Sequence, residues 1–348
     1  MREISKEELD KILEDHKLWL EKKESKCADL SHVNLSHTNL SNIDLSGINL
    51  EGADLTGANL EGTVLRYAKI TNTKLIHANL KRTDMSGVIL KDSDLRNADL
   101  SYASLVCAIL NDANLKDVNL ICSSLKCANL NHANLFHANL KFADIRFADL
   151  SNAYLNHANL ECTDLRGANL ENANLNDANL KYTDLTNANL KNAYLRNADL
   201  NSSNLENANL RGADLRGANL SNTDLINANL EDIKTGVNTI GYDLACPEEG
   251  SFIGYKKASG YIIKLLILDD SKRSSATSLK CRCDKAKVLD IESICTGEKV
   301  NYVCSDYNKD FIYKVGETVH VDNFDDNRWN ECTSGIHFFI NKSHAINY

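Results

Sequence analysis

Residues 156–180 read NHANL ECTDL RGANL ENANL NDANL, with a leucine at every fifth position. The same spacing runs from Leu30 to Leu230 without an insertion, and only Ile70, Met85 and Ile145 replace the leucine. A small residue, usually alanine, stands two positions before it, and Asp or Asn lies between the two in 32 of the 41 repeats. A period of five fits neither an α-helix nor an ordinary strand, so the segment must form another regular structure.

Side-chain directions within each repeat predict the nature of that structure. In an extended segment, residues two apart point to the same side, so the small residue and the leucine share an interior and the Asp or Asn points away. One repeat cannot bury this apolar pair, but stacked repeats can, and each buried leucine contributes roughly 1.5–3 kcal/mol. We therefore expect a solenoid whose backbone hydrogen bonds join neighbouring coils.

The tandem pattern A(D/N)LXX, as in ADLTGANLEG at 53–62 and ANLENANLNDANL at 168–180, resembles the pentapeptide-repeat family. The resemblance implies a right-handed quadrilateral β-helix with four repeats per coil, about ten coils and a length of roughly 50 Å, in which residues about 20 apart stack on one face. The expected fold class is all-β. It combines this solenoid with an N-terminal α-helical cap and a small, mainly β C-terminal domain.

The chain is expected to divide into four parts: a helical cap at 1–26, the β-helix at 27–231, a linker at 232–251 and the C-terminal domain at 252–348. Ser5 and Glu8 form a capping-box pattern, and an apolar face follows. That face consists of Leu9, Ile12, Leu13, His16 and Leu20. A cap on the first coil is the simpler interpretation, and a partner-binding amphipathic helix is the alternative.

The C-terminal segment resembles an uncharacterised domain found beside such repeats in phages and large DNA viruses. The resemblance rests on KCR at 280–282, FDDNRWNEC at 324–332 and SGIHFFI at 334–340. It implies a viral origin and no known activity.

Composition excludes several classes of protein. The formal net charge is −9, which argues against a general nucleic-acid-binding protein. The sequence contains no run of 18 apolar residues, so no membrane span is predicted. The Lys- and Glu-rich N-terminus has no apolar signal-peptide core. We therefore expect a cytoplasmic location, which is the host cytoplasm if the protein is viral. The eleven cysteines are an odd number, which favours reduced thiols over a disulfide framework.

Stacking would place Asp144, Asp164 and Asp184 in one column, the best candidate surface for a basic partner. Some family members resemble B-DNA in charge and inhibit type II topoisomerases. Here Arg146 and Arg166 stand two residues after Asp144 and Asp164, which weakens that analogy.

A second expected column is apolar and consists of Tyr102, Cys122, Phe142, Cys162 and Tyr182. Cys107, Cys127 and Phe147 would stack on another corner. Exposed apolar residues in a line form a patch, and such patches are often interfaces. The partner at this patch is a foreign protein, a second copy of the chain or its own C-terminal domain. A line of cysteines is a poor metal site because the ligands do not surround a point.

In the C-terminal domain, alternation along a strand would turn Leu279, Cys281 and Cys283 inward and leave Lys280 and Arg282 on an outward basic face. Such a face predicts contact with an anion or a nucleic acid. Arg328 and Trp329, together with Asn330 and Glu331, form a cluster typical of a recognition surface or of a satisfied turn.

We expect a non-enzymatic scaffold that presents the β-helical surface to a protein partner, without cofactor or metal. Dimerisation through an apolar column or an open end is an additional expectation. One alternative is a DNA-mimicking inhibitor of a type II topoisomerase or another DNA-binding protein. The other is an enzyme in the C-terminal domain, which a pocket joining Cys332, His337 and Asp306 would favour.

Overall fold

A computed structural model describes residues 1–22, 26–242, 246–247, 249–275, 277–329 and 333–348. The chain divides into two compact units. The first contains Met1–Asn219 and Asn227–Thr239, and the second contains Leu220–Ile226 and Ile240–Tyr348.

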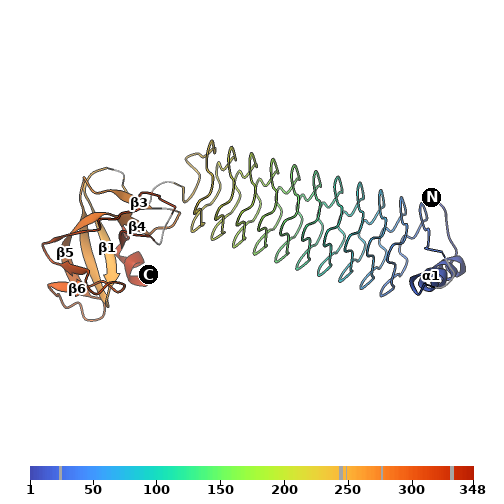
Figure 1. The fold of residues 1–348 in the computed structure, drawn as a ribbon, viewed down its shortest axis with the longest axis horizontal. Coiled ribbons are helices and arrows are strands. Elements are labelled where there is room, and N and C mark those ends of the chain that lie inside the picture. Colours follow the sequence, from blue (N-terminus) through green and yellow to red (C-terminus); the bar gives the residue numbers. More distant parts are fainter. Residues whose placement is uncertain (23–25, 243–245, 248, 276, 330–332) are drawn as a thin grey trace. The chain divides into compact units, whose positions relative to one another are not determined.

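The first unit is a β-helix in which each coil has four five-residue sides. Parallel bridges join residues 20 apart, from Asp29 with Asn49 to Asp214 with Lys234. Figure 1 shows these coils following one another along a single axis, coloured from blue to yellow. The expected stacking of residues 20 apart is therefore confirmed for the bridged positions.

The hydrogen bonds of one repeat explain why its sequence is so regular. The N–H groups of Asn129, Leu130 and His132 donate to carbonyl oxygens of adjacent coils at 2.7–3.1 Å. The N–H group of Ala133 donates to the Leu130 carbonyl at 2.9 Å and closes a turn. The N–H group of Asn131 donates to the side-chain Oδ1 of Asn129 at 3.0 Å. All five donors are satisfied, and the Asp or Asn position supplies an acceptor for the turn.

The corner residue two positions after each leucine adopts a left-handed backbone conformation, as in His132 with φ 57°. Asn, Asp, His and Gly tolerate this region better than other residues, and they occupy most of these corners. Large residues also occur there, including Tyr102 and Phe142. Each corner points its side chain away from the interior.

The interior is a continuous stack of leucine and small side chains. Leu130 and Ala133 are almost completely buried, and so is the residue at every fifth position from Leu30 to Leu225. Where Thr63 takes the small position, its hydroxyl donates to the Leu40 carbonyl at 2.7 Å. The polar group is thus satisfied inside an apolar core.

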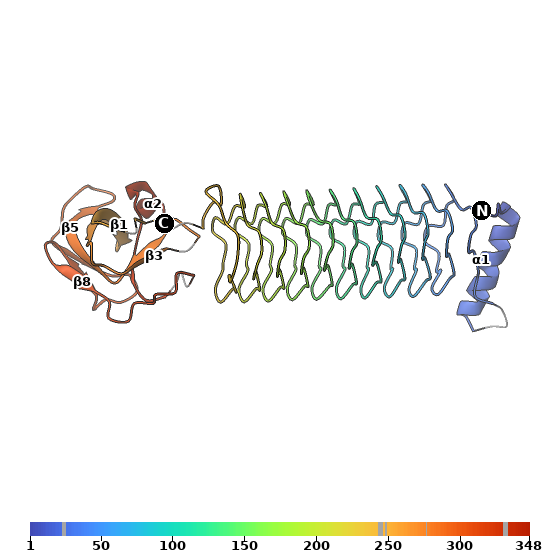
Figure 2. The same cartoon turned by 90° about the horizontal axis from the view of Figure 1, so that it is seen from above.

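The N-terminal helix α1 (Lys6–Leu20) begins at Ser5, whose side chain accepts a hydrogen bond from the Glu8 N–H at 3.1 Å. His16 on its buried face accepts a hydrogen bond from the Ala28 N–H at 3.2 Å, through Nδ1. Figure 2 shows α1 beside the blue end of the coils. No helix among the described residues is both long and apolar enough to cross a membrane.

The second unit is mainly β. Its strands are β1 (Phe252–Ala258), β2 (Tyr261–Ile267), β3 (Arg273–Ser275), β4 (Cys281–Cys283), β5 (Lys285–Ser293), β6 (Tyr302–Cys304), β7 (Ile312–Lys314), β8 (Thr318–His320) and β9 (Ile336–Phe338). They pair antiparallel in three sheets of order β1-β2-β5-β8, β3-β4-β9 and β6-β7. A short helix, α2 (Lys342–Asn347), follows, and Asn341 caps it.

Alternating apolar residues of the strands build the core of this unit. Ile263 and Leu265 of β2 lie beside Ile291 and Val288 of the neighbouring strand β5, and together with Ile267 they belong to one buried cluster. Strand β1 also bonds to the residue that follows β9, because Tyr255 and Phe339 exchange N–H to carbonyl hydrogen bonds at 2.7 and 2.8 Å. This link brings residues of β1 and β9 to one face.

Candidate functional site

The acidic column of the β-helix is a ladder of alternating charges. Arg146 binds Asp144 in a bidentate fashion at 2.8 and 2.6 Å and reaches Asp164 of the next coil at 3.4 Å. Arg166 repeats the arrangement, with 2.9 and 2.6 Å to Asp164 and 3.5 Å to Asp184. Each arginine therefore lies between two carboxylates, and the column offers no unbroken row of negative charge.

The pKa of Asp144 reflects this pairing. The hydrogen bond from the Arg146 side chain lowers the pKa of Asp144 below its usual range, and partial burial opposes the effect. The ionised form is thus held by its neighbour.

The apolar column lies on one corner line of the β-helix. Tyr102, Phe142 and Tyr182 are 60%, 54% and 58% exposed, and Cys122 and Cys162 occupy the coils between them. All five residues have positive φ, which places them at corresponding corners of successive coils. We call these five residues the aromatic edge.

The other corner lines have different chemistry. Cys107, Cys127 and Phe147 follow one another on a second line, where Phe147 is exposed. On a third, the rings of His137 and His157 lie 5.0 Å apart. The ten described cysteines are free, and no group of three metal-ligating His, Cys, Asp or Glu side chains occurs among the described residues.

The basic face predicted on β4 was wrong. Lys280 and Arg282 are only 8% and 2% exposed, whereas Leu279, expected inside, is 57% exposed. The Arg282 guanidinium donates to the carbonyls of residues 325, 327 and 334 at 2.9–3.2 Å. Backbone from the region before β9 thus covers the outer side of β4, and the arginine has a structural role.

Arg328 and Trp329 also serve the internal structure of the second unit. The Arg328 guanidinium lies 4.5 Å from the Trp329 ring centre and donates to the carbonyls of Ser275, at 3.1 Å, and Tyr242. Both side chains are half-buried. This arrangement matches a satisfied turn more closely than a recognition surface. Asn330 and Glu331 lie outside the described residues.

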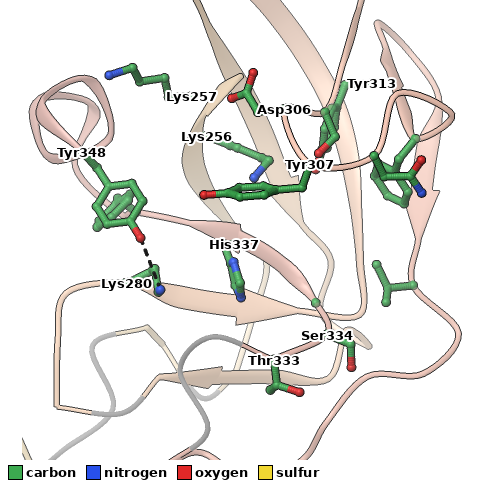
Figure 3. Close-up of a pocket in the computed structure, with 16 residues that line it drawn as sticks. Lys256, Lys257, Lys280, Asp306, Tyr307, Tyr313, Thr333, Ser334, His337 and Tyr348 are labelled. Atoms are coloured by element: carbon green, nitrogen blue, oxygen red, sulfur yellow. Dashed lines mark hydrogen bonds between the residues drawn. The ribbon is translucent and has the colours of Figure 1, made fainter. Parts of the chain in front are cut away.

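A cavity of about 540 Å³ opens in the second unit, and we call it the lysine cavity (Figure 3). Lys256 of β1, Lys280, Tyr313 of β7 and His337 of β9 line it, together with Tyr348. Further lining residues are Lys257, Ser305, Asp306, Tyr307, Asn308, Phe311, Val321, Thr333, Ser334, Gly335 and Phe339.

The lysine cavity can be compared with the pocket that would favour an enzyme in the C-terminal domain. It brings together two of the three expected residues, Asp306 and His337. Asp306 already accepts hydrogen bonds from the backbone N–H and the hydroxyl of Ser259, at 2.8 and 3.2 Å. Cys332 lies outside the described residues.

A family model described as pentapeptide repeats (8 copies) matches ten overlapping spans that run from 28 to 232, more than half of the chain. The chain belongs to the pentapeptide-repeat family. A second model, a family of unknown function (DUF5758), matches residues 242–345 of this pentapeptide-repeat protein. The viral origin implied by the sequence stays a prediction.

Several solved pentapeptide-repeat structures are similar to the chain. HetL from Nostoc sp. strain PCC 7120, involved in heterocyst differentiation regulation, is 31% identical over 66% of this chain and 94% of its own, with a TM-score of 0.39. Rfr23 from Cyanothece 51142 is 44% identical over 27% of this chain and 61% of its own, with a TM-score of 0.22. QnrB1, a plasmid-mediated fluoroquinolone resistance protein, is 16% identical over 60% of this chain and 90% of its own, with a TM-score of 0.28. No curated protein matches.

The sequence of this pentapeptide-repeat protein did not reveal most of the lysine cavity. Lys256, Tyr313 and Tyr348 come from distant parts of the C-terminal unit, and no motif connects them. The one available signal was the lysine pair KK at 256–257 inside an apolar strand pattern. A lysine at such a position is worth noting because alternation places one of the two on the inner face.

Proposed function

We propose that the protein is a non-enzymatic binding scaffold that presents its aromatic edge to a protein partner. The observation that carries the proposal is the run Tyr102, Cys122, Phe142, Cys162 and Tyr182 at corresponding exposed corners of successive coils. At a spacing of about 4.8 Å per coil, the edge is roughly 19 Å long. That length suits a helix or an extended segment of a partner.

The chemistry of the edge supports a role in binding. Tyrosine and phenylalanine are enriched at the centres of protein interfaces, where they contribute most of the affinity. Their backbone is held on both sides by coil-to-coil hydrogen bonds, such as the bond from the Phe142 N–H to the Glu161 carbonyl at 3.2 Å. Binding therefore costs little backbone entropy.

Folding alone does not explain these aromatic residues. The same corner column carries Asn42, Gly62 and Asn222 in other coils, all with positive φ. Asparagine and glycine adopt this conformation more readily than tyrosine or phenylalanine. The aromatic side chains are thus placed where smaller residues fit the backbone better.

We further propose that residues 1–26 cap the first coil, that 27–231 form the scaffold, that 232–251 link and that 252–348 form a separate domain. The hydrogen bond between His16 and Ala28 supports the cap. A parallel bridge between Arg2 and Val33 adds to it, because it covers backbone groups at the open end.

The test replaces Tyr102, Phe142 and Tyr182 together by asparagine. Asparagine suits the left-handed corner, so folding should be preserved. A matched control replaces Asp92, Asp112 and His132, which occupy the same corner position on another line, by asparagine. Cross-linked captures from an extract of the source cells are then compared for the three proteins.

We expect the wild type and the control to retain a specific partner that the edge variant loses by about tenfold or more. Sedimentation of the purified proteins identifies self-association as the cause if the partner is a second copy. Equal recovery by all three proteins, or no enrichment by any, contradicts the proposal.

A further inference from the structure

The lysine cavity has the chemistry of a ligand site, independent of the aromatic edge. Figure 3 shows Lys256, Lys280 and His337 directed into one space, with Tyr348 to one side. The residues come from β1, from β9 and from segments beside β4 and α2, so the sheets fix their positions. Pockets of about 300–1,000 Å³ with a few converging polar groups typically hold small ligands.

Lys256 is the first group that calls for a partner. Its side chain is half-buried, and no acidic group among the described residues lies within ion-pair distance of its ammonium. Burial lowers the pKa of Lys256; nearby Asp306 opposes this and Lys280 adds to it. A half-buried ammonium without a counterion is costly, and an anion in the cavity would stabilise it.

His337 is the second such group. Its Nε2 atom is buried and has no hydrogen-bond partner among the described residues. Burial and the charges of Lys280, Lys256 and Arg282 lower the pKa of His337 to about 4, and a hydrogen bond with the Thr333 backbone opposes them. Unsatisfied buried polar atoms are rare in folded proteins, and one that borders a cavity is a candidate contact for a ligand.

Aromatic rings border the same space. The Lys256 ammonium lies 5.8 Å from the Tyr313 ring centre, and the Lys280 ammonium lies 5.5 Å from that of Tyr348. The Lys280 ammonium also donates to the Tyr348 hydroxyl at 3.4 Å. Tyr348 packs against Phe339, with ring centres 5.1 Å apart, and is itself 69% exposed, so part of this side chain is accessible to the ring of a ligand.

The charge of the lining selects the kind of anion. Its described residues include the three lysines 256, 257 and 280 and one carboxylate, Asp306, which gives a net charge of about +2 with His337 neutral. A phosphate monoester carries about −1.5 to −2 at neutral pH, so it balances this charge better than a monocarboxylate.

We propose that the lysine cavity binds a phosphate monoester that carries a flat ring, of the size of a mononucleotide. The phosphate contacts Lys256 and Lys280, and the ring stacks on Tyr348. A polar atom of the ligand meets Nε2 of His337. The proposal extends beyond the scaffold function, because it concerns the C-terminal unit and does not require the aromatic edge.

The test is calorimetric titration of the full-length protein with adenosine 5′-monophosphate. Adenosine and inorganic phosphate serve as the two half-probes. Lys256→Gln removes the ammonium, and Tyr348→Leu removes the ring at an exposed position where folding should be unaffected. The matched control is Lys287→Gln, which makes the same charge change at an exposed lysine of β5 outside the cavity.

We expect one mononucleotide per chain, with each half-probe weaker by about tenfold or more. Lys256→Gln and Tyr348→Leu should each lower the affinity for the mononucleotide by about tenfold, and Lys287→Gln should leave the affinity within about twofold of the wild-type value. Equal affinity for the mononucleotide and inorganic phosphate overturns the ring contact, and equal affinity for adenosine overturns the anion contact. No binding, or binding unchanged in Lys256→Gln, overturns the site as a whole.

Discussion

The ring of Phe147 lies over Gly167 on the next coil, where a Cβ atom added to the glycine would fall 2.7 Å from the Phe147 Cδ1 atom. Tyr67 lies over Gly87 in the same way, at 2.6 Å. Corner side chains of the β-helix thus extend toward the following coil and cover its corner. A large corner residue is best followed by a small one, and the aromatic edge fits this rule because cysteines separate its rings.

Gly167→Ala should destabilise the protein for two reasons. Gly167 has φ +66°, a conformation that costs an alanine about 1–2 kcal/mol, and the new methyl group displaces the Phe147 ring. Thermal melts should show a larger loss for Gly167→Ala than for Asn187→Ala, which changes the next corner of the same line without a ring above it. The double variant Phe147→Ala/Gly167→Ala should recover the part of the lost stability that comes from displacement of the Phe147 ring. An equal loss in Gly167→Ala and Asn187→Ala contradicts the contact.

The sequence was most informative where one local rule repeats. The leucines from Leu30 to Leu225 lie buried among equivalent neighbours one coil away, so the period of five, and with it a solenoid, could be read from the sequence itself. The stacking of residues 20 apart came from the resemblance to the family, because the period does not fix the number of repeats per coil. The Asp or Asn was expected to point outward, but its additional bond to the backbone of the turn was not foreseen. The C-terminal unit was harder, because its contacts join distant segments. Arg282 is buried by backbone some 40 to 50 residues later, which strand alternation cannot anticipate.

The cysteine corners provide a check of the register in solution. Cys107 and Cys127 are exposed on adjacent coils, at a spacing of about 4.8 Å, whereas Cys122 and Cys162 are two coils apart with Phe142 between them. The short thiol cross-linker dibromobimane should therefore join Cys107 to Cys127 and leave Cys122 unlinked to Cys162. Peptide mass spectrometry identifies the products. A dominant Cys122 to Cys162 product would mean that the coils are stacked differently.

The arginine ladder predicts a pH-dependent contribution to stability. Because the Arg146 hydrogen bond lowers the pKa of Asp144 in the folded state, the pair stabilises the fold above the unfolded carboxyl pKa of about 3.9 and loses its effect as pH falls through the lower folded value. Arg146→Gln should therefore lower the melting temperature slightly at pH 7, by an amount equivalent to about 0–1 kcal/mol. Once the pH lies below the lowered folded-state pKa of Asp144, the two proteins should melt together. A difference that grows on acidification contradicts the assignment.

The same ladder argues against mimicry of DNA. Arg146 and Arg166 each lie between two carboxylates, so the column lacks the row of uncompensated charge that a phosphate backbone presents. In a supercoiling assay with a purified type II topoisomerase, equimolar protein should leave the activity unchanged. Arg146→Gln/Arg166→Gln leaves the carboxylates uncompensated and should inhibit more strongly than the wild type. Inhibition by the wild type at equimolar protein would overturn this interpretation.

The final prediction compares two adjacent residues on opposite sides of one strand. Lys74 bridges Asp54 and Asp94 in the stack, and its ammonium lies 3.7 Å from Asp54 Oδ2. Lys74→Asp removes this exposed pair, worth about 0–1 kcal/mol, and aligns three like charges. It also restores the Asp that accepts a hydrogen bond from the turn in most other repeats, which offsets part of the cost. We therefore expect a small change in the free energy of unfolding.

Leu75→Asp should behave in the opposite way, because Leu75 is completely buried among the stacked leucines. An aspartate there must lose its hydration without a partner or take up a proton, and it also leaves a gap in the core. Thermal melts of both variants should show Lys74→Asp close to the wild type and Leu75→Asp unfolded or strongly destabilised. A larger loss in Lys74→Asp would mean that the two residues have exchanged sides. The columns that define the arginine ladder and the aromatic edge would then be wrong as well, because all of them depend on the same register.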